Sequence, residues 1–212
     1  MSPALDPTNI RAIIFDLGNV LIDIDYDVMV AEFKKIAKYD FRDMISYAHQ
    51  DNIFNLFEKG QISAADFRTA LRPYLRDGVT DSEIDYAWNS ILIEYPVAKF
   101  EMLQRLKDKY KLYALSNINE LHAVAIDSHV SPVFGVQDMR IFFDHAYYSH
   151  EIGHRKPEKE IYRAVLDHAR LNPAQTLFID DKAENTEAAA AFGIQVYNLA
   201  DRDSLLDILH LF

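Results

Sequence analysis

Short apolar runs alternate with helix-like stretches near both ends of the chain. Residues 12–15 form a continuously apolar run, which is typical of a strand buried on both faces of a parallel sheet. Further strands are predicted at residues 111–115, 145–149, 176–179 and 194–198. Helical patterns are predicted at residues 100–110, 120–129, 158–170, 184–192 and 204–209. Strands that alternate with helices indicate parallel pairing and right-handed crossovers, and therefore an α/β fold.

The stretch between the first and second predicted strands has a different pattern. From residue 26 to residue 94 the apolar positions recur at helical spacing, and we predict no strand there. Ser63 is placed to cap one helix, and Thr80 with Glu83 forms a capping box for another. We therefore expect a small α-helical domain at 26–94, inserted into a core domain made of 1–25 and 95–212.

The composition narrows the possible functions. The formal net charge of −11 disfavours nucleic-acid binding, although a local cation still allows a small phosphorylated substrate. The absence of cysteine excludes thiolate catalysis and disulfides. No apolar run is long enough to span a bilayer, and residues 1–9 do not form a signal peptide. We expect a cytoplasmic protein without membrane or nucleic-acid partners; oligomeric state has no sequence signal.

Polar residues follow the predicted strands at the points where those strands end. Because ligands bind outside the carboxyl ends of parallel strands, these residues are the candidates for chemistry. They are Asp16, Ser116, Asn117, Lys156, Asp180 and Asp181. For any one of these residues alone, a helix cap or a solvated loop charge is at least as good an explanation. An acid, a hydroxyl, a lysine and an acid pair at successive strand ends point to one shared site.

Four short motifs contain these residues. They are IFDLGNVL at 14–21, LSN at 115–117, Lys156-Pro157, and FIDDKAEN at 178–185. Their order resembles that of the haloacid dehalogenase superfamily of hydrolases, over nearly the whole chain. The subgroup that the motifs resemble most is that of bacterial phosphatases acting on sugar phosphates such as α-D-glucose 1-phosphate. The resemblance implies a Rossmann-like parallel sheet with a small α-helical cap domain inserted after the first strand.

The resemblance also implies a nucleophile and a metal. Asp16 would attack phosphorus to give an aspartyl-phosphate, which divides hydrolysis into two easier steps. Mg²⁺ prefers oxygen ligands, commonly one or two carboxylates with water and substrate phosphate. The family pattern, aligned on Asn185, assigns the protein ligands to Asp16, the Gly18 carbonyl and Asp181. Asp180 would orient metal-bound water from outside the ligand shell.

The remaining candidates would contact the phosphoryl group. Lys156 would neutralise Asp16 and the transferring oxygens as a point charge. The Ser116 hydroxyl and the backbone amide of Asn117 would donate to the same oxygens. The resemblance and these residues therefore imply a small phosphorylated substrate, and a sugar phosphate is the class that we expect.

The proton donor is the departure from the family pattern. Phosphatases of the family usually carry a second aspartate two residues after the nucleophile, and Gly18 stands there. Asp23 and Asp25 lie at the entry to the helical block, either as charged hinge residues or as substitutes for that acid. His122 is either a partly buried structural histidine or a substrate contact. Trp88, at helical spacing, is expected in the apolar interior of the block.

Three functions are compatible with this pattern. The first is an Mg²⁺-dependent phosphomonoester hydrolase. The second is a 2-haloacid dehalogenase, which needs no metal; adjacent carboxylates at Asp180 and Asp181 disfavour it, since they would repel without a cation. The third is a non-catalytic protein that binds phosphate and Mg²⁺ for regulation, which Gly18 keeps open.

Overall fold

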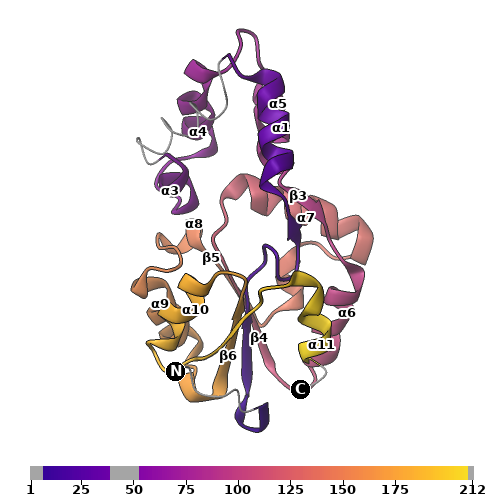
Figure 1. Cartoon of the computed structure of the whole chain (residues 1–212), viewed down its shortest axis with the longest axis vertical. Coiled ribbons are helices and arrows are strands. Elements are labelled where there is room, and N and C mark those ends of the chain that lie inside the picture. Colours follow the sequence, from indigo (N-terminus) through magenta and orange to yellow (C-terminus); the bar gives the residue numbers. More distant parts are fainter. Residues whose placement is uncertain (1–6, 39–52, 210–212) are drawn as a thin grey trace.

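The computed structural model describes residues 7–38 and 53–209, and its central element is a five-stranded sheet in the order β5-β4-β1-β6-β7. The strands are β1 (Ala12–Phe15), β4 (Lys111–Ser116), β5 (His145–Tyr148), β6 (Thr176–Asp180) and β7 (Gln195–Asn198). Every pairing in the sheet is parallel, and β1 lies at its centre between β4 and β6 (Figure 1). The predicted α/β fold is confirmed, with strand positions within one residue of expectation.

Helices cover both faces of this sheet. They are α6 (Val97–Leu106), α7 (Glu120–Phe134), α8 (Ser149–Ile152), α9 (Lys159–Ala169), α10 (Ala183–Ala190) and α11 (Leu205–Leu209). Short 3-10 helices span Pro7–Asn9, Arg72–Tyr74, Met139–Phe142, Pro173–Gln175 and Arg202–Ser204. In Figure 1, α6 and α11 lie on one side of the strands and α9 and α10 on the other.

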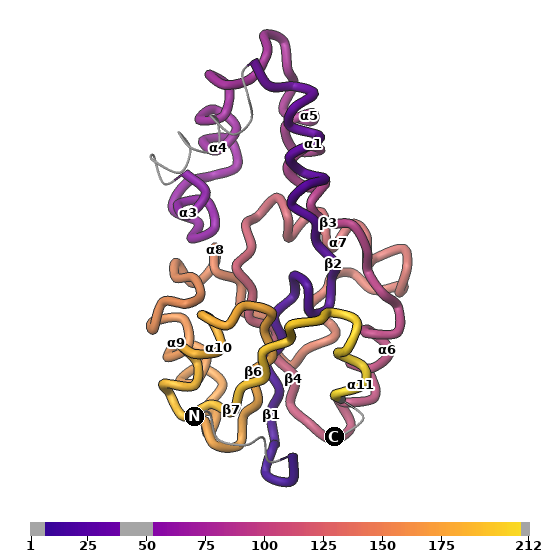
Figure 2. The backbone as a smooth tube through the Cα atoms, viewed as in Figure 1, coloured from indigo at the N-terminus to yellow at the C-terminus, as the bar shows by residue number. Residues whose placement is uncertain are grey.

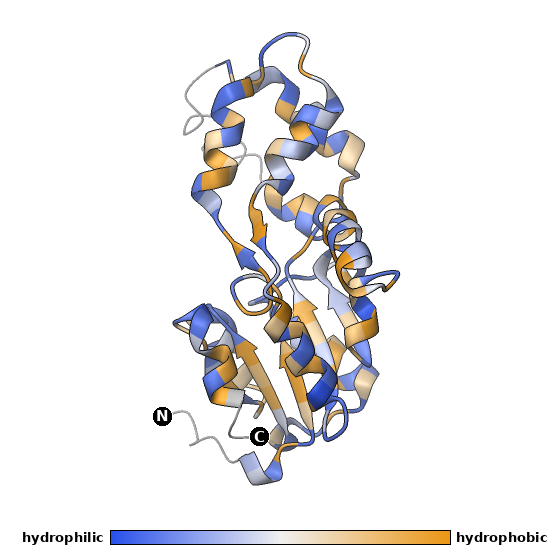
Figure 3. Ribbon diagram, turned by 90° about the vertical axis from the view of Figure 1, so that its right-hand side faces the viewer, coloured by the Kyte–Doolittle hydropathy of each residue, from blue (hydrophilic) through white to orange (hydrophobic). Residues whose placement is uncertain are grey.

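The side chains of β1 show why its sequence is continuously apolar. Ile13 and Phe15 pack into the cluster formed with α6 and α7, whereas Ala12 and Ile14 pack into the cluster under α9 and α10. Successive side chains of a strand point to opposite faces, so a strand covered on both faces needs apolar residues at every position. Figure 3 shows the resulting apolar strands between more polar helices.

The inserted block contains α1 (Tyr26–Ile36), α3 (Ile53–Glu58), α4 (Ala64–Leu71) and α5 (Asp81–Asn89). These helices share an apolar cluster of their own, in which the Trp88 ring lies 4.8 Å from that of Phe67. The expected cap at Ser63 and the expected capping box at Thr80 are both present, and Ser63 also forms a capping box, with Asp66. The block lies over the carboxyl ends of the strands (Figures 1 and 2).

Two short strands connect the block to the sheet domain. Asp23–Ile24 (β2) pairs antiparallel with Leu92–Glu94 (β3) where the chain enters and leaves the block. The prediction of no strand within 26–94 was therefore wrong. A strand of two or three residues is too short to show a period, and its partner lies far along the chain. The domain boundaries at 25/26 and 94/95, within this ribbon, stay a prediction, and residues 1–6 and 39–52 lie outside the described part.

Candidate active site

Asp16 lies directly after β1 and is held by the backbone around it. Its N–H donates to the carbonyl of Ile179 (2.9 Å), which continues the ladder towards β6. The N–H of Leu17 donates to Asp16 Oδ1 at 2.7 Å, so the carboxylate has a fixed orientation. The loop then closes tightly, with Ile22 N–H donating to the Leu17 carbonyl (2.8 Å). The end of the central strand thus presents one carboxylate rigidly at the edge of the sheet.

Lys156 connects Asp16 to the acid pair. Its Nζ lies 2.8 Å from Asp16 Oδ1 and 2.7 Å from Asp180 Oδ2, and the residue is 1% exposed. Burial alone would lower the pKa of Lys156, but the charges of both carboxylates outweigh burial and raise it. Burial raises the pKa of Asp16 to about 7, against the lowering effect of Lys156. The ammonium is therefore firmly charged, whereas the nucleophile candidate is poorly solvated.

The loop that carries Lys156 is fixed by the end of β4. Lys156 N–H donates to Asn117 Oδ1 (2.8 Å), and Asn117 Nδ2 donates to the Lys156 carbonyl (2.9 Å). The Asn117 side chain thus forms two hydrogen bonds with the backbone of Lys156, an arrangement that the sequence did not predict. Ser116, the last residue of β4, is buried and lines the neighbouring pocket.

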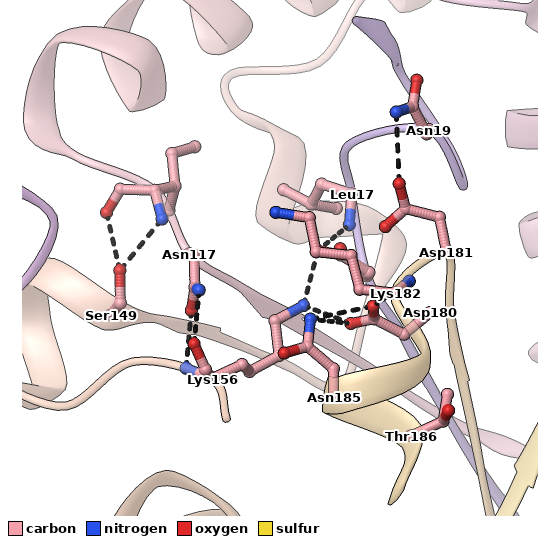
Figure 4. A network of polar contacts seen from close by, with 12 residues as sticks. Leu17, Asn19, Asn117, Ser149, Lys156, Asp180, Asp181, Lys182, Asn185 and Thr186 are labelled. Carbon is pink, nitrogen blue, oxygen red and sulfur yellow. Dashed lines mark hydrogen bonds and ion pairs between the residues drawn. The ribbon is translucent and has the colours of Figure 1, made fainter. Parts of the chain in front are cut away.

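The two acids at the end of β6, Asp180 in the strand and Asp181 directly after it, have different surroundings (Figure 4). Asp180 is fully buried and accepts hydrogen bonds from Asn185 Nδ2 (2.9 and 3.1 Å) and Lys182 N–H (2.9 Å), besides its contact with Lys156. Asp181 is half-buried and accepts one hydrogen bond, from Asn19 Nδ2 at 3.2 Å. Asp180 is thus saturated by protein donors, and Asp181 has more capacity left for a cation.

The residue that reaches Asp181 occupies an uncommon backbone conformation. Asn19 has a φ of 55°, in the left-handed region that asparagine tolerates better than most residues. Its side-chain oxygen accepts from Ile24 N–H (3.3 Å) while its nitrogen donates to Asp181. The sequence marked Asn19 only as a turn former, and the structure gives it a second contact.

The carboxylates form a plausible cation site. Ligand atoms of Asp16, Asp180 and Asp181 all lie within 4.8 Å of one another. Lys156 is the cation that bridges two of them, so negative charge remains in excess. Oxygen donors in a partly dehydrated, acidic site suit Mg²⁺. The residues present therefore fit the expected metal, and the individual ligand assignments stay proposals.

The two hinge aspartates are held by contacts outside the acid cluster. Asp23 is buried, with Lys99 Nζ 3.1 Å and Arg202 Nε 3.6 Å from its carboxylate. Asp25 caps α1 by accepting from Asp27 N–H at 2.8 Å. Both carboxylates thus have structural partners, and the alternative that either supplies the missing acid loses its basis.

His122 is also held by structural contacts. One ring nitrogen of His122 lies 3.1 Å from Asn119 Nδ2, and the other lies 3.2 Å from the Trp88 carbonyl oxygen. The His122 ring also stacks on the Trp88 ring. Burial lowers the pKa of His122 to about 4, so the ring is neutral near pH 7. Trp88 packs in the apolar cluster of the block, as its spacing predicted.

A pocket lies between the block and the strand ends. Its polar lining includes Gly18, Ser116, Asn117 and His122. It also includes Glu58, the last residue of α3, which the sequence analysis did not single out. The only local signal for Glu58 was a charged helix end before Gly60, because the pocket arises from packing of segments far apart in sequence. Its apolar lining is Leu17, Ile22, Ile24, Tyr26, Met29, Trp88, Ile91, Leu92, Ile118 and Ile126.

Comparison with known proteins identifies a family whose members are hydrolases. The family model of haloacid dehalogenase-like hydrolases matches residues 10–193. The chain therefore belongs to this family, and the resemblance and the expected class of enzyme, a hydrolase, are confirmed. In the described part of the chain, no helix is long and apolar enough to cross a membrane.

Individual relatives cover most of the chain. A D-ribitol-5-phosphate phosphatase of Bacteroides thetaiotaomicron is 30% identical, covering 89% of this chain and 91% of the relative. A solved haloacid dehalogenase family enzyme from the same organism, in complex with magnesium and inorganic phosphate, has a TM-score of 0.82 at 36% identity and covers 89% and 93% of the two chains. A predicted hydrolase of the family from Porphyromonas gingivalis has a TM-score of 0.83 at 31% identity and covers 95% and 97%.

Proposed function

We propose that the protein is an Mg²⁺-dependent phosphomonoester hydrolase that forms an aspartyl-phosphate on Asp16. The observation that carries this proposal is the cluster in which Lys156 bridges Asp16 and Asp180 beside a third carboxylate, Asp181. Relatives named as a sugar-alcohol phosphate phosphatase and crystallised with magnesium and phosphate support it. The substrate class that follows is a small sugar or sugar-alcohol phosphate.

The residues divide the work as follows. Asp16, with one carboxylate oxygen held by Leu17 N–H and Lys156, presents the other oxygen to phosphorus. Lys156, Ser116 and the Asn117 backbone amide offset charge on the transferring oxygens. When bound, Mg²⁺ neutralises the phosphate so that two anions can approach.

The metal ligands that we propose are Asp16, the Gly18 carbonyl and Asp181. Asp180 would act from outside the ligand shell, because protein donors already satisfy it. The same excess of carboxylates disfavours a 2-haloacid dehalogenase, whose chemistry displaces halide without a cation to offset the repulsion.

The test is phosphate release from a panel of phosphorylated metabolites and an aryl phosphate, with and without Mg²⁺. We expect activity that needs Mg²⁺, disappears with chelator and is lost in Asp16→Asn. Asp207→Asn, an exposed aspartate on α11, is the matched control and should retain full activity. Turnover by Asp16→Asn, or turnover without metal, would contradict the mechanism. A wild type that binds phosphate but never releases it from any ester would indicate the regulatory alternative.

A further inference from the structure

We propose that Glu58, carried by the helical block, protonates the leaving group in place of the acid that is absent at Gly18. The inference rests on the proposed function and adds a catalytic residue to it. It would mean that the nucleophile and its acid come from different parts of the molecule, the strand end and α3.

The location of Glu58 is the first support. Glu58 and Gly18 line the same pocket, together with Ser116 and Asn117 at the end of β4. Among the described residues that line this pocket, Glu58 is the one with a carboxyl group. Leu17 and Gly18, the two residues that follow Asp16, line this pocket, so the leaving group of a substrate whose phosphate reaches Asp16 has room in the pocket that Glu58 also lines.

The contacts of Glu58 hold its backbone in place, and its carboxyl group forms an ion pair with Arg155. The Ser149 hydroxyl donates to the Glu58 backbone carbonyl at 2.6 Å, which fixes the end of α3 against the core. Arg155 Nε lies 2.8 Å from Glu58 Oε2, but the pair is not aligned as a hydrogen bond, and both atoms are buried without one. Burial of this carboxyl group costs free energy when it is ionised, and the ion pair with Arg155 offsets only part of that cost, because the pKa stays raised.

Burial and the neighbouring positive charges act in opposite directions on the pKa of Glu58. Burial raises the pKa of Glu58 above its ordinary value, although Arg155, Lys182 and Lys156 all lower it. A carboxyl group whose pKa is raised by burial keeps its proton to higher pH than an exposed one, which favours a role as general acid. This direction fits the role that the position suggests.

Other ionisable groups near the site are less suitable. Both ring nitrogens of His122 are engaged, and Asp23 and Asp25 are held by structural partners. Tyr26 also lines the pocket and is 54% exposed, so the experiment must distinguish its hydroxyl from Glu58.

The proton transfers balance over the two steps. In the first, an oxygen of Asp16 bonds to phosphorus, the bond from phosphorus to the leaving oxygen breaks, and the Glu58 proton passes to that oxygen to give an alcohol. In the second, the Glu58 carboxylate takes a proton from water as the water oxygen bonds to phosphorus. The bond from phosphorus to Asp16 then breaks, which releases phosphate and restores both carboxyl groups.

Glu58→Gln tests this role through its dependence on the leaving group. For a primary alkyl or polyol phosphate we expect kcat/KM to fall by about 10²–10⁴-fold, the usual contribution of general acid catalysis. For an aryl phosphate, whose phenolate needs no proton to leave, kcat/KM should stay near the wild-type value. Its kcat should fall, with a burst of phenol close to one per enzyme, because water attack on the aspartyl-phosphate is slowed.

Matched variants complete the experiment. Glu120→Gln is the control, because Glu120 contacts Ala64 N–H of the block outside this pocket and glutamine keeps the accepting oxygen. It should behave as wild type on both substrates. An equal loss on both substrates in Glu58→Gln, no loss on either, or a loss specific to alkyl phosphates in Tyr26→Phe instead would each overturn the assignment. A wild type inactive on both substrates would refute the proposed function, which is a separate outcome.

Discussion

Asp16, the proposed nucleophile, should destabilise the folded protein when no metal is bound, so Asp16→Asn is expected to stabilise it. Burial raises the pKa of Asp16 from 3.8 to about 7, which means that folding disfavours the ionised carboxylate. At about 1.4 kcal/mol per pKa unit, this shift corresponds to roughly 4 kcal/mol of lost stability at pH 8. Asparagine is nearly isosteric and uncharged, so the variant should recover much of this loss, with about 4 kcal/mol as the upper limit.

The stability difference between Asp16→Asn and wild type should increase with pH. An acid whose folded pKa is raised destabilises the protein as pH rises above the unfolded value near 3.8, and the effect is complete above the folded value near 7. Urea unfolding with chelator present should therefore show a gap between Asp16→Asn and wild type that is large at pH 8. The gap should fall below about 2 kcal/mol at pH 5. Mg²⁺ should narrow the gap at pH 8, because the metal binds the folded wild type preferentially.

The result that would refute this reasoning is a variant less stable than wild type at pH 8 without Mg²⁺. In that case the 2.8 Å ion pair with Lys156 would outweigh the cost of burying Asp16. Asp207→Asn, on the exposed face of α11, controls for the general effect of removing a negative charge.

Four further substitutions test the site and its surroundings. Asp181→Ala should raise the Mg²⁺ concentration for half-maximal activity more than Asp180→Ala, measured by Mg²⁺ titration; a larger effect at Asp180 would reverse the ligand assignment. Asn19→Ala should weaken Mg²⁺ affinity by about 10–100-fold, since it removes the 3.2 Å contact that orients Asp181, and an unchanged titration would contradict that. Gly60→Ala should unfold at lower temperature and lose kcat/KM, because its φ is +64° and a Cβ would lie 2.1 Å from the His150 carbonyl; wild-type values in both assays would show that this contact yields.

The strands and most of the site were predictable because their signals are local. A continuously apolar run predicts a doubly covered strand, and the residue after such a strand must lie at the edge of the sheet where ligands bind. Asp16, Ser116 and Asp180 were located in this way, within one residue of the strand ends. Position alone, however, does not say what each side chain touches.

The contacts that were not predicted join segments that are distant in the chain. The side-chain amide of Asn117 forms two hydrogen bonds with the backbone of Lys156, which is thirty-nine positions away. No periodic pattern in the sequence predicts such a contact. Asp23 of β2 and Lys99 of α6 form a buried ion pair, which no local pattern reports either, because the two residues are far apart in the sequence. Glu58 enters the site only because α3 packs over the strand ends, which depends on the tertiary arrangement of the block.

The surroundings of Gly18 explain why an acid on the block suits this molecule. Gly18 does not have a positive φ, so its backbone would accept a side chain, but a Cβ there would lie 3.0 Å from Ile24 Cδ1. Ile24 belongs to β2, the strand that carries the chain into the block, and the end of its side chain would have to move to admit a side chain at position 18. An acid on α3 is free of that restriction. It would also make proton transfer conditional on α3 docking against the core through Ser149. The leaving group would then be protonated, and water deprotonated for attack, only while the block covers the site.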